Sequence, residues 1–322
     1  MSNSPAAGRR SAALAAVVFG GALVGVQARI NGELTTRVGS ALTAAMLSFV
    51  TGTVPLLAAL PAARGGIARL CRAPVRAWWF FGGLGGAALV AVTAHAVPRI
   101  GVALAGVCLV AGTTAGALAV DRVGLGPSGR HPATRWRLGG VAIVVAAVAL
   151  GAIGETHRHI EPLLFVGLFA AGAAAAAQQA ANGQLRVAAD DTVVASLISF
   201  AGGSLALVLA AAIAGDINAG SWPGTWWLYL GGPLGTAYIA IGAVAVRVLG
   251  VLRFALGVVA GQLVMSVVLD ASWPEPGASL RAVTVVAATL TVGGVWLSGR
   301  DTVDHPLADH GASDSNAGRS WR

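Results

Sequence analysis

The sequence predicts an all-α polytopic membrane protein, with about ten transmembrane helices arranged as two inverted repeats of five helices. Three observations support this fold class. Of the 322 residues, 56% are hydrophobic and only 11% are charged, whereas about 25% of a soluble domain is charged. The apolar residues form long blocks separated by short arginine-bearing stretches. Finally, residues of the first half of the chain recur in the second half.

The apolar blocks are the candidate membrane spans, because most of them approach the ~20 residues that cross ~30 Å of hydrocarbon. Alanine and glycine dominate them, and such small residues allow close helix packing in lipid. The predicted helices are 12–34, 39–60, 77–97, 100–120, 137–154, 163–185, 192–214, 226–246, 249–270 and 281–299. The predicted regions are a cytoplasmic N-terminus at 1–11, a first five-helix repeat at 12–154, a second repeat at 163–299 and a disordered cytoplasmic tail at 300–322.

The arginines predict the orientation of the helices. The chain has 21 arginines and no lysine. If the N-terminus is cytoplasmic, 16 arginines lie on the inner side and only Arg29, Arg37, Arg99, Arg158 and Arg281 on the outer side. Basic residues are enriched in cytoplasmic loops, so both termini are expected in the cytoplasm. This distribution also explains the basic composition without nucleic-acid binding, which is not expected.

The start of the chain has a second interpretation. Arg9 and Arg10 precede an apolar run that ends near Gln27, an arrangement also found in secretory and twin-arginine signal peptides. The same segment recurs later in the chain, which favours a structural helix.

The internal repeat spans about 150 residues and five predicted helices. Residues 27–52 match 178–203 at an offset of 151, with 8 of 26 positions identical. Residues 82–121 match 231–270 at an offset of 149, with 14 of 40 identical. An odd number of helices inverts the second copy in the membrane, an architecture that recurs in secondary transporters.

These repeated residues resemble the drug/metabolite transporter superfamily, and more narrowly its YdcZ-like branch with an EamA-type 5+5 repeat. The motif N-G-x-L at 31–34 and 182–185 carries the resemblance, each copy being followed by a Ser-Phe-x2-Gly helix. The Trp-Gly openings at 78–86 and 226–235 and the Ala-Gly pairs at 111–112 and 260–261 also fit. The resemblance implies a ten-helix inner-membrane carrier, with a homodimer as one arrangement, and leaves the substrate open.

The candidate substrate-binding residues are polar side chains at repeated positions. Polar amides in hydrocarbon require partners or water and usually face the bundle interior. They could line a central polar cavity, or they could fix helix packing through hydrogen bonds. The set comprises Gln27, Asn31, Glu33, Ser48, Thr113, Gln178, Asn182, Gln184, Ser199 and Gln262.

Glu33 is the acidic candidate of the first helix, and Arg29 lies one turn before it. Within the membrane Glu33 could accept a proton or meet a cationic substrate. At a helix end it would form a solvated ion pair instead. Asp121 and Asp270 end equivalent predicted helices and are interpreted as helix termini.

The expected function is secondary transport of a small polar or amphipathic metabolite or drug across the cytoplasmic membrane by alternating access, in the direction of export. A non-transporting membrane scaffold and a membrane enzyme acting on a lipid-linked substrate are the alternatives. The sequence contains no Walker loop, zinc motif or nucleophile elbow, so no enzyme activity, cofactor, metal or catalytic residue is expected. Membrane lipid and an unknown small molecule are the expected partners, and proton coupling and facilitated exchange both fit.

Overall fold

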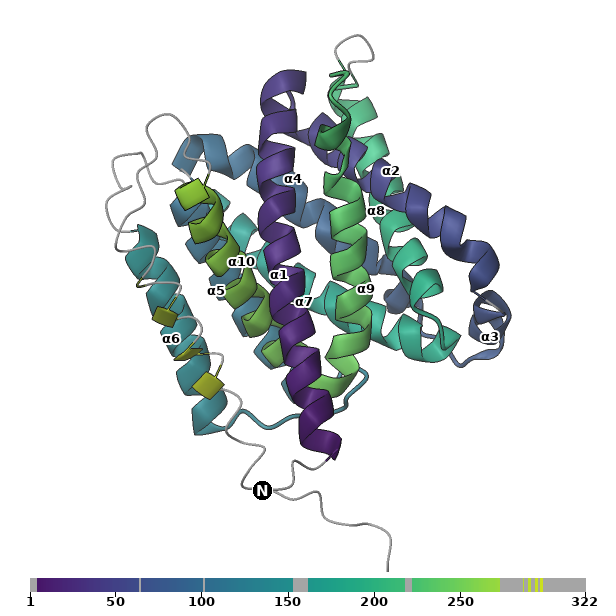
Figure 1. The fold of residues 1–322 in the computed structure, drawn as a ribbon, viewed down its shortest axis with the longest axis vertical. Helices are drawn as coiled ribbons and strands as arrows, with labels where there is room; N and C mark the ends of the chain where they lie inside the picture. Colours follow the sequence, from purple (N-terminus) through teal and green to yellow (C-terminus); the bar gives the residue numbers. More distant parts are fainter. Residues whose placement is uncertain are drawn as a thin grey trace, which may run out of the picture.

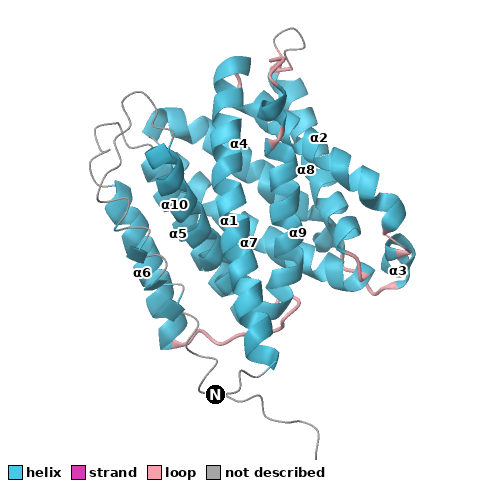
Figure 2. Ribbon diagram, viewed as in Figure 1, coloured by secondary structure: helices cyan, strands magenta, loops and turns pink. Residues whose placement is uncertain are grey.

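The computed structural model describes residues 5–63, 65–100, 102–152, 162–217 and 222–272, and residues 286, 289, 290, 293, 294, 296 and 297. Throughout these residues the regular structure is helical, without strands (Figure 2). The long helices are α1 (Pro5–Val38), α2 (Ala41–Ala59), α4 (Gly82–Ile100), α5 (Val102–Val123), α6 (Arg135–Ala152), α7 (Pro162–Ala189), α8 (Thr192–Ala214), α9 (Gly231–Leu249) and α10 (Val251–Ser272). Shorter elements are α3 (Gly66–Arg72) and the 3₁₀ turns η1 (Leu60–Ala62), η2 (Ala77–Phe81) and η3 (Trp226–Tyr229).

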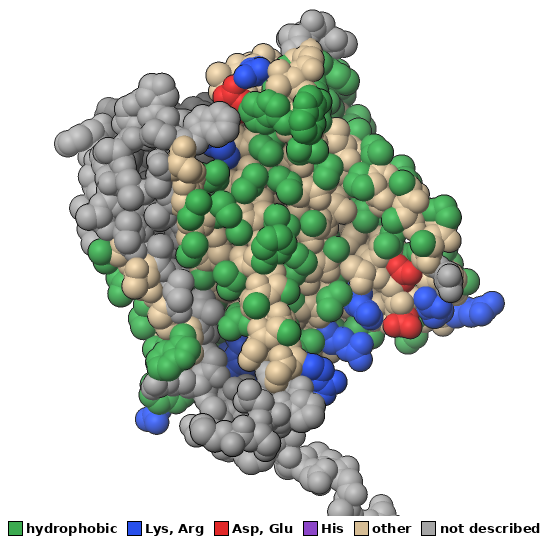
Figure 3. All heavy atoms as spheres, viewed as in Figure 1, with side chains coloured by type: hydrophobic (Ala, Val, Ile, Leu, Met, Phe, Trp, Pro, Cys, Tyr) green, Lys and Arg blue, Asp and Glu red, His purple; other side chains and the backbone are tan. Residues whose placement is uncertain are grey.

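The helices form a bundle whose surface suits lipid. Five helical stretches in the described part are long and apolar enough to cross a membrane: Gly8–Val38, Ala41–Ala62, Leu163–Ala189, Thr192–Ala214 and Trp226–Leu249. Ala77–Thr93 and Val251–Gln262 are shorter apolar helices. Large apolar side chains point outward, as shown by Leu163 at 81% and Ile213 at 87% exposure. Figure 3 shows a broad apolar face with charged side chains toward its ends. The protein is therefore embedded in a membrane.

Helix α1 begins earlier and ends later than the predicted range of 12–34. Pro5 is its first residue, a position where proline is favoured because its missing N–H is not needed. Alanine and arginine are strong helix formers, so the helix continues through Arg9 and Arg10. Residues 5–11 therefore belong to the same helix as residues 12–38, whereas the predicted helix begins at residue 12. The predicted tail at 300–322 and most of the predicted helix at 281–299 lie outside the described residues.

The turns between α1 and α2 and between α7 and α8 are built alike. Gly39 and Asp190, which are equivalent at an offset of 151, both have positive φ, of 80° and 48°. The next residues, Ser40 and Asp191, are the N-caps. Ser40 accepts from the Thr43 N–H at 3.2 Å, and Asp191 accepts from Val193 and Val194. Each cap satisfies N–H groups that would otherwise have no partner at the start of a helix.

The helix packing exchanges partners between the two halves of the chain. Helix α1 packs against α9 and α10, and α7 packs against α4 and α5 (Figure 1). Between them α2 packs against α8, where the equivalent rings of Phe49 and Phe200 lie 5.3 Å apart between centroids. Each half therefore completes the core of the other.

Glycines bring these helices into backbone contact. A Cβ atom on Gly261 of α10 would meet the carbonyl oxygen of Val18 in α1, and one on Gly112 of α5 would meet that of Phe169 in α7. Gly21 and Gly172 make the reciprocal contacts from α1 and α7. Only glycine leaves room for backbones this close together.

Candidate functional site

The amides of α1 lie against the beginning of α9. A Cβ on Gly231 would meet Asn31 Oδ1, and one on Gly235 would lie 2.8 Å from Gln27 Nε2. Ser48 of α2 faces the same spot, because its Oγ would lie 3.2 Å from the Gly231 Cβ. The missing side chains of two glycines therefore create the space that two amides fill.

The amides of α7 make the equivalent contacts with α4. A Cβ on Gly82 would lie 3.2 Å from Asn182 Oδ1, and one on Gly86 would lie 3.0 Å from Gln178 Nε2. Gln178 Nε2 also donates to Ser199 Oγ of α8 at 3.3 Å. The repeated amides and the repeated Gly-x3-Gly motifs are thus complementary parts of two matching interfaces.

Several polar atoms in these two clusters are buried without a hydrogen-bond partner among the described residues. They are Asn31 Oδ1, Ser48 Oγ and both side-chain polar atoms of Asn182, whose side chain is fully buried. An unpaired buried polar group costs about 1–3 kcal/mol. These atoms are therefore available to hydrogen-bond a polar ligand or water that enters either interface.

The two clusters lie toward opposite ends of the bundle. Asn31 meets the first residue of α9, whereas Gly183, which follows Asn182, faces Val246 near the end of α9. The structure thus pairs each amide set with its own glycines and serine, at two separate interfaces. The binding role of both sets stays a prediction.

Glu33 lies in the last turns of α1 and is 40% exposed. Its Oε1 accepts from Arg37 Nε at 2.8 Å, one turn further along the helix. A glutamate four residues before its basic partner has the better orientation for a helix ion pair. Arg37 also donates to Thr225 Oγ1 at 3.0 Å and lies 5.9 Å from the centre of the Trp227 ring. Glu33 therefore belongs to an exposed network that joins α1 to the turn before α9.

The remaining candidates lie at other contacts between helices. Gln184 donates to the carbonyl of Leu125 at 2.9 Å. The backbone nitrogen of Thr113 is 2.7 Å from the Cβ position of Gly172. The carbonyl oxygen of Gln262 is 3.4 Å from the Cβ position of Gly25. Both residues are therefore part of the glycine-mediated packing of α5 on α7 and of α10 on α1.

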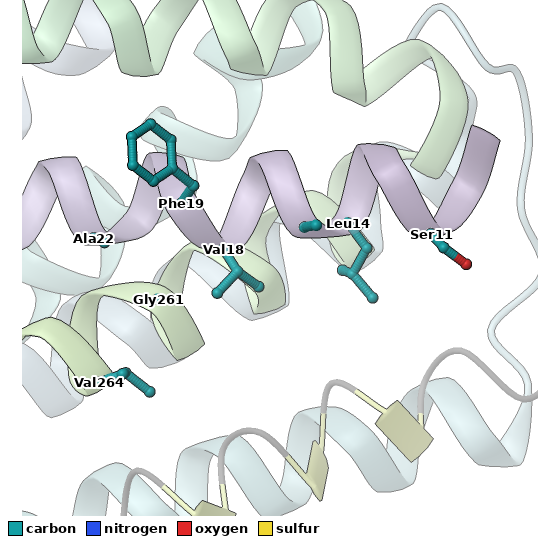
Figure 4. A pocket seen from close by; sticks show the side chains of 8 residues that line it. Ser11, Leu14, Val18, Phe19, Ala22, Gly261 and Val264 are labelled. Carbon is teal, nitrogen blue, oxygen red and sulfur yellow. The ribbon is translucent and has the colours of Figure 1, made fainter. Parts of the chain in front are cut away.

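A groove of about 560 Å³ runs beside α1 and α10 (Figure 4). Its walls are almost entirely apolar, so it offers little to a polar ligand. The lining residues are Ser11, Leu14, Ala15, Val18, Phe19, Ala22, Gly261 and Val264.

The structure also assigns a role to Asp121 that sequence reasoning missed. Asp121 is in the last turn of α5, as predicted, but its side chain is fully buried. It accepts from the N–H groups of Val251 at 2.8 Å and Leu252 at 3.2 Å, at the start of α10, and pairs with the buried Arg137. Asp121 thus caps a helix from elsewhere in the chain. Its recurrence at Asp270 was the available signal, and the side chain of Asp270 lies outside the described residues.

His131, in the loop between α5 and α6, lies beside this network. Its backbone N–H donates to the Asp121 carbonyl at 2.9 Å, and its Nε2 is 3.0 Å from Ser128 Oγ. Burial lowers the pKa of His131 below its usual value of 6.5. Asp121 opposes this shift, whereas Arg137, Arg253 and Arg10 add to it.

The depressed pKa of His131 predicts a loss of stability in acid. The neutral ring is favoured in the folded state, so this contribution is present above pH 6.5 and is lost as the pH falls through the lower folded pKa. Between about pH 7.5 and 5 the melting temperature should fall more for the wild type than for His131→Gln. Identical pH profiles for the two proteins would contradict the assignment.

Fold and packing define the chain as a polytopic helical membrane protein. The sequence model of one family, described as "Putative inner membrane exporter, YdcZ", matches residues 12–150 and again residues 163–297. The chain belongs to this YdcZ family of the drug/metabolite transporters, which confirms the resemblance seen in the sequence.

The other comparisons bear on the fold alone. One solved structure, entitled "Crystal structure of protein", superposes on this chain with a TM-score of 0.63 and 18% sequence identity. The alignment covers 90% of this chain and 96% of the other. No curated protein is significantly similar in sequence.

Proposed function

We propose that this family member is a secondary transporter that exports a small polar or amphipathic solute across the inner membrane by alternating access. In this proposal ten helices form two inverted repeats, and both termini are cytoplasmic. The main support is that one exporter family matches each half of the chain separately. Two homologous halves of opposite orientation can exchange conformations around a site between them.

The packing supports the same proposal. Exchanging α1 with α7, α2 with α8, α4 with α9 and α5 with α10 converts the main helix contacts of one half into those of the other. The equivalent residues Asn31 and Asn182 lie toward opposite ends of the bundle, as inversion requires. The arginine distribution supports cytoplasmic termini.

The substrate can be sought with purified protein in detergent. A panel of amino acids, nucleosides, sugars and quaternary ammonium cations is screened for compounds that raise the melting temperature, because a ligand stabilises the state that it binds. A compound that does so is then followed into sealed vesicles containing the protein. Flux above that of protein-free vesicles is the expected result.

Two variants test the predicted binding residues. Asn31→Ala and Glu33→Gln are expected to reduce flux by about tenfold or more, without loss of folded protein, if these side chains contact the solute. Unchanged flux in both variants would remove them from the mechanism. A folded wild-type protein that transports no solute of the panel would favour the scaffold alternative.

A further inference from the structure

Helices α7 and α9 are in contact from the middle of the bundle to the end where α1 begins. Gln179 Nε2 of α7 donates to the Tyr238 hydroxyl of α9 at 2.8 Å. One turn further along α7, the Cβ position of Gly183 is 3.4 Å from Val246 Cγ1. These contacts hold the C-terminal half of α7 against the middle and the last turns of α9.

The loop at 124–134 crosses the same end of the bundle (Figure 1). Leu125 accepts a hydrogen bond from Gln184 of α7 at 2.9 Å. Pro127 Cγ is 2.8 Å from the Cβ position of Gly183, and Gly126 lies under Val251 at the start of α10. The loop therefore contacts both α7 and the turn between α9 and α10.

Asp121 lies just before this loop and Arg137 just after it. Their buried ion pair joins the end of α5 to the start of α6. The same carboxylate caps α10, so three helices meet at one charged group. A buried carboxylate so placed holds its partners in a single arrangement.

The residues equivalent to Gln179, Tyr238 and Gln184 differ at the other end of the bundle. By the offsets of the repeat, Ala28 replaces Gln179, Leu89 replaces Tyr238 and Glu33 replaces Gln184. The packing differs too, because α7 is packed on α9 whereas α1 and α4 are not among the extensively packed pairs of the described residues. The hydrogen bonds of Gln179 and Gln184 are therefore not repeated at the equivalent positions, and the other end is joined by different ones, such as that from Arg37 to Thr225.

We propose that Gln179, Tyr238, Gln184 and the Asp121–Arg137 pair form a gate that extends from the middle of the bundle to the end where α1 begins. The inference rests on the proposed transport function: the structure is the state closed at this end, and the gate opens when α7 separates from α9. In this role the five side chains position helices.

Cysteine accessibility tests the gate. Ala180 is fully buried among α5, α9 and α10, so a cysteine there reports opening. Ala180→Cys is made with Cys71→Ser and Cys108→Ser, and a membrane-impermeant maleimide is applied to vesicles of either orientation. Tyr238→Phe with Gln184→Leu removes two hydrogen bonds at nearly constant shape. We expect labelling about tenfold faster than in the parent, only in vesicles that expose the N-terminus.

Asp190→Asn is the matched control. Asp190 lies beside the gate, is 72% exposed and pairs with Arg186 at 3.5 Å, so its loss should leave labelling unchanged. Unchanged labelling in the double variant and in Tyr238→Phe alone, at the parent melting temperature, would overturn the gate. Equal acceleration from both sides would do so too, because it indicates general loosening. Since labelling needs no solute, faster labelling without any flux would refute transport alone, and flux with unchanged labelling would refute the gate alone.

Discussion

Replacing Gly261 by alanine is expected to destabilise the bundle by about 3 kcal/mol or to prevent folding. The new Cβ would meet the Val18 carbonyl oxygen and lie 2.7 Å from its carbon and 3.1 Å from the Ala22 nitrogen. All three are backbone atoms, so no side-chain rotation relieves the clash and α10 has to move away from α1. Thermal unfolding in detergent, followed by circular dichroism, measures the effect.

Gly32→Ala is the control for this substitution. Gly32 lies within α1, and nothing is within 4 Å of its Cβ position. Alanine there should leave the protein as stable as before or raise its stability by up to about 1 kcal/mol, because alanine is the better helix former. Equal melting temperatures for Gly261→Ala and Gly32→Ala would show that the α1–α10 contact is looser than described.

Asp121→Asn is expected to cost about 3 kcal/mol, because it leaves Arg137 buried and charged without its partner. Asparagine has a single acceptor oxygen, so it can keep the hydrogen bond from the Val251 N–H but loses the one that Leu252 donates to the second carboxylate oxygen. Adding Arg137→Met should restore much of the lost stability, since a buried ion pair can be replaced by apolar groups at little cost. A double variant as unstable as the single one would show that the unpaired charge of Arg137 is not the cause of the loss.

The helices could be predicted from the sequence because each depends on its own apolar block. The predicted ranges fail mainly at ends such as residues 5–11, where helix propensity outweighs charge. The repeat was inferred by comparing the chain with itself, and its inverted arrangement stays a prediction. The partners of the helices could not be predicted, because apolar faces rich in alanine and glycine are nearly interchangeable in lipid.

The sequence was enough to name the residues of the candidate site, but not to show which of them are in contact. Gln27, Asn31 and the Gly231-x3-Gly235 motif were each recognised, but nothing in the sequence showed that they face one another. Asp121 looked like a helix end and is one. Its second role depends on residues 130 positions further along the chain, which no local pattern can reveal.

The exchange of partners between halves has a consequence for biogenesis. Helix α1 leaves the ribosome long before α9 and α10, the helices that it packs against. Until they are made, Gln27 and Asn31 face lipid or a temporary neighbour, without the glycines that later receive them. The first half is therefore inserted before its packing partners exist, and assembly finishes only when the last helices reach the membrane.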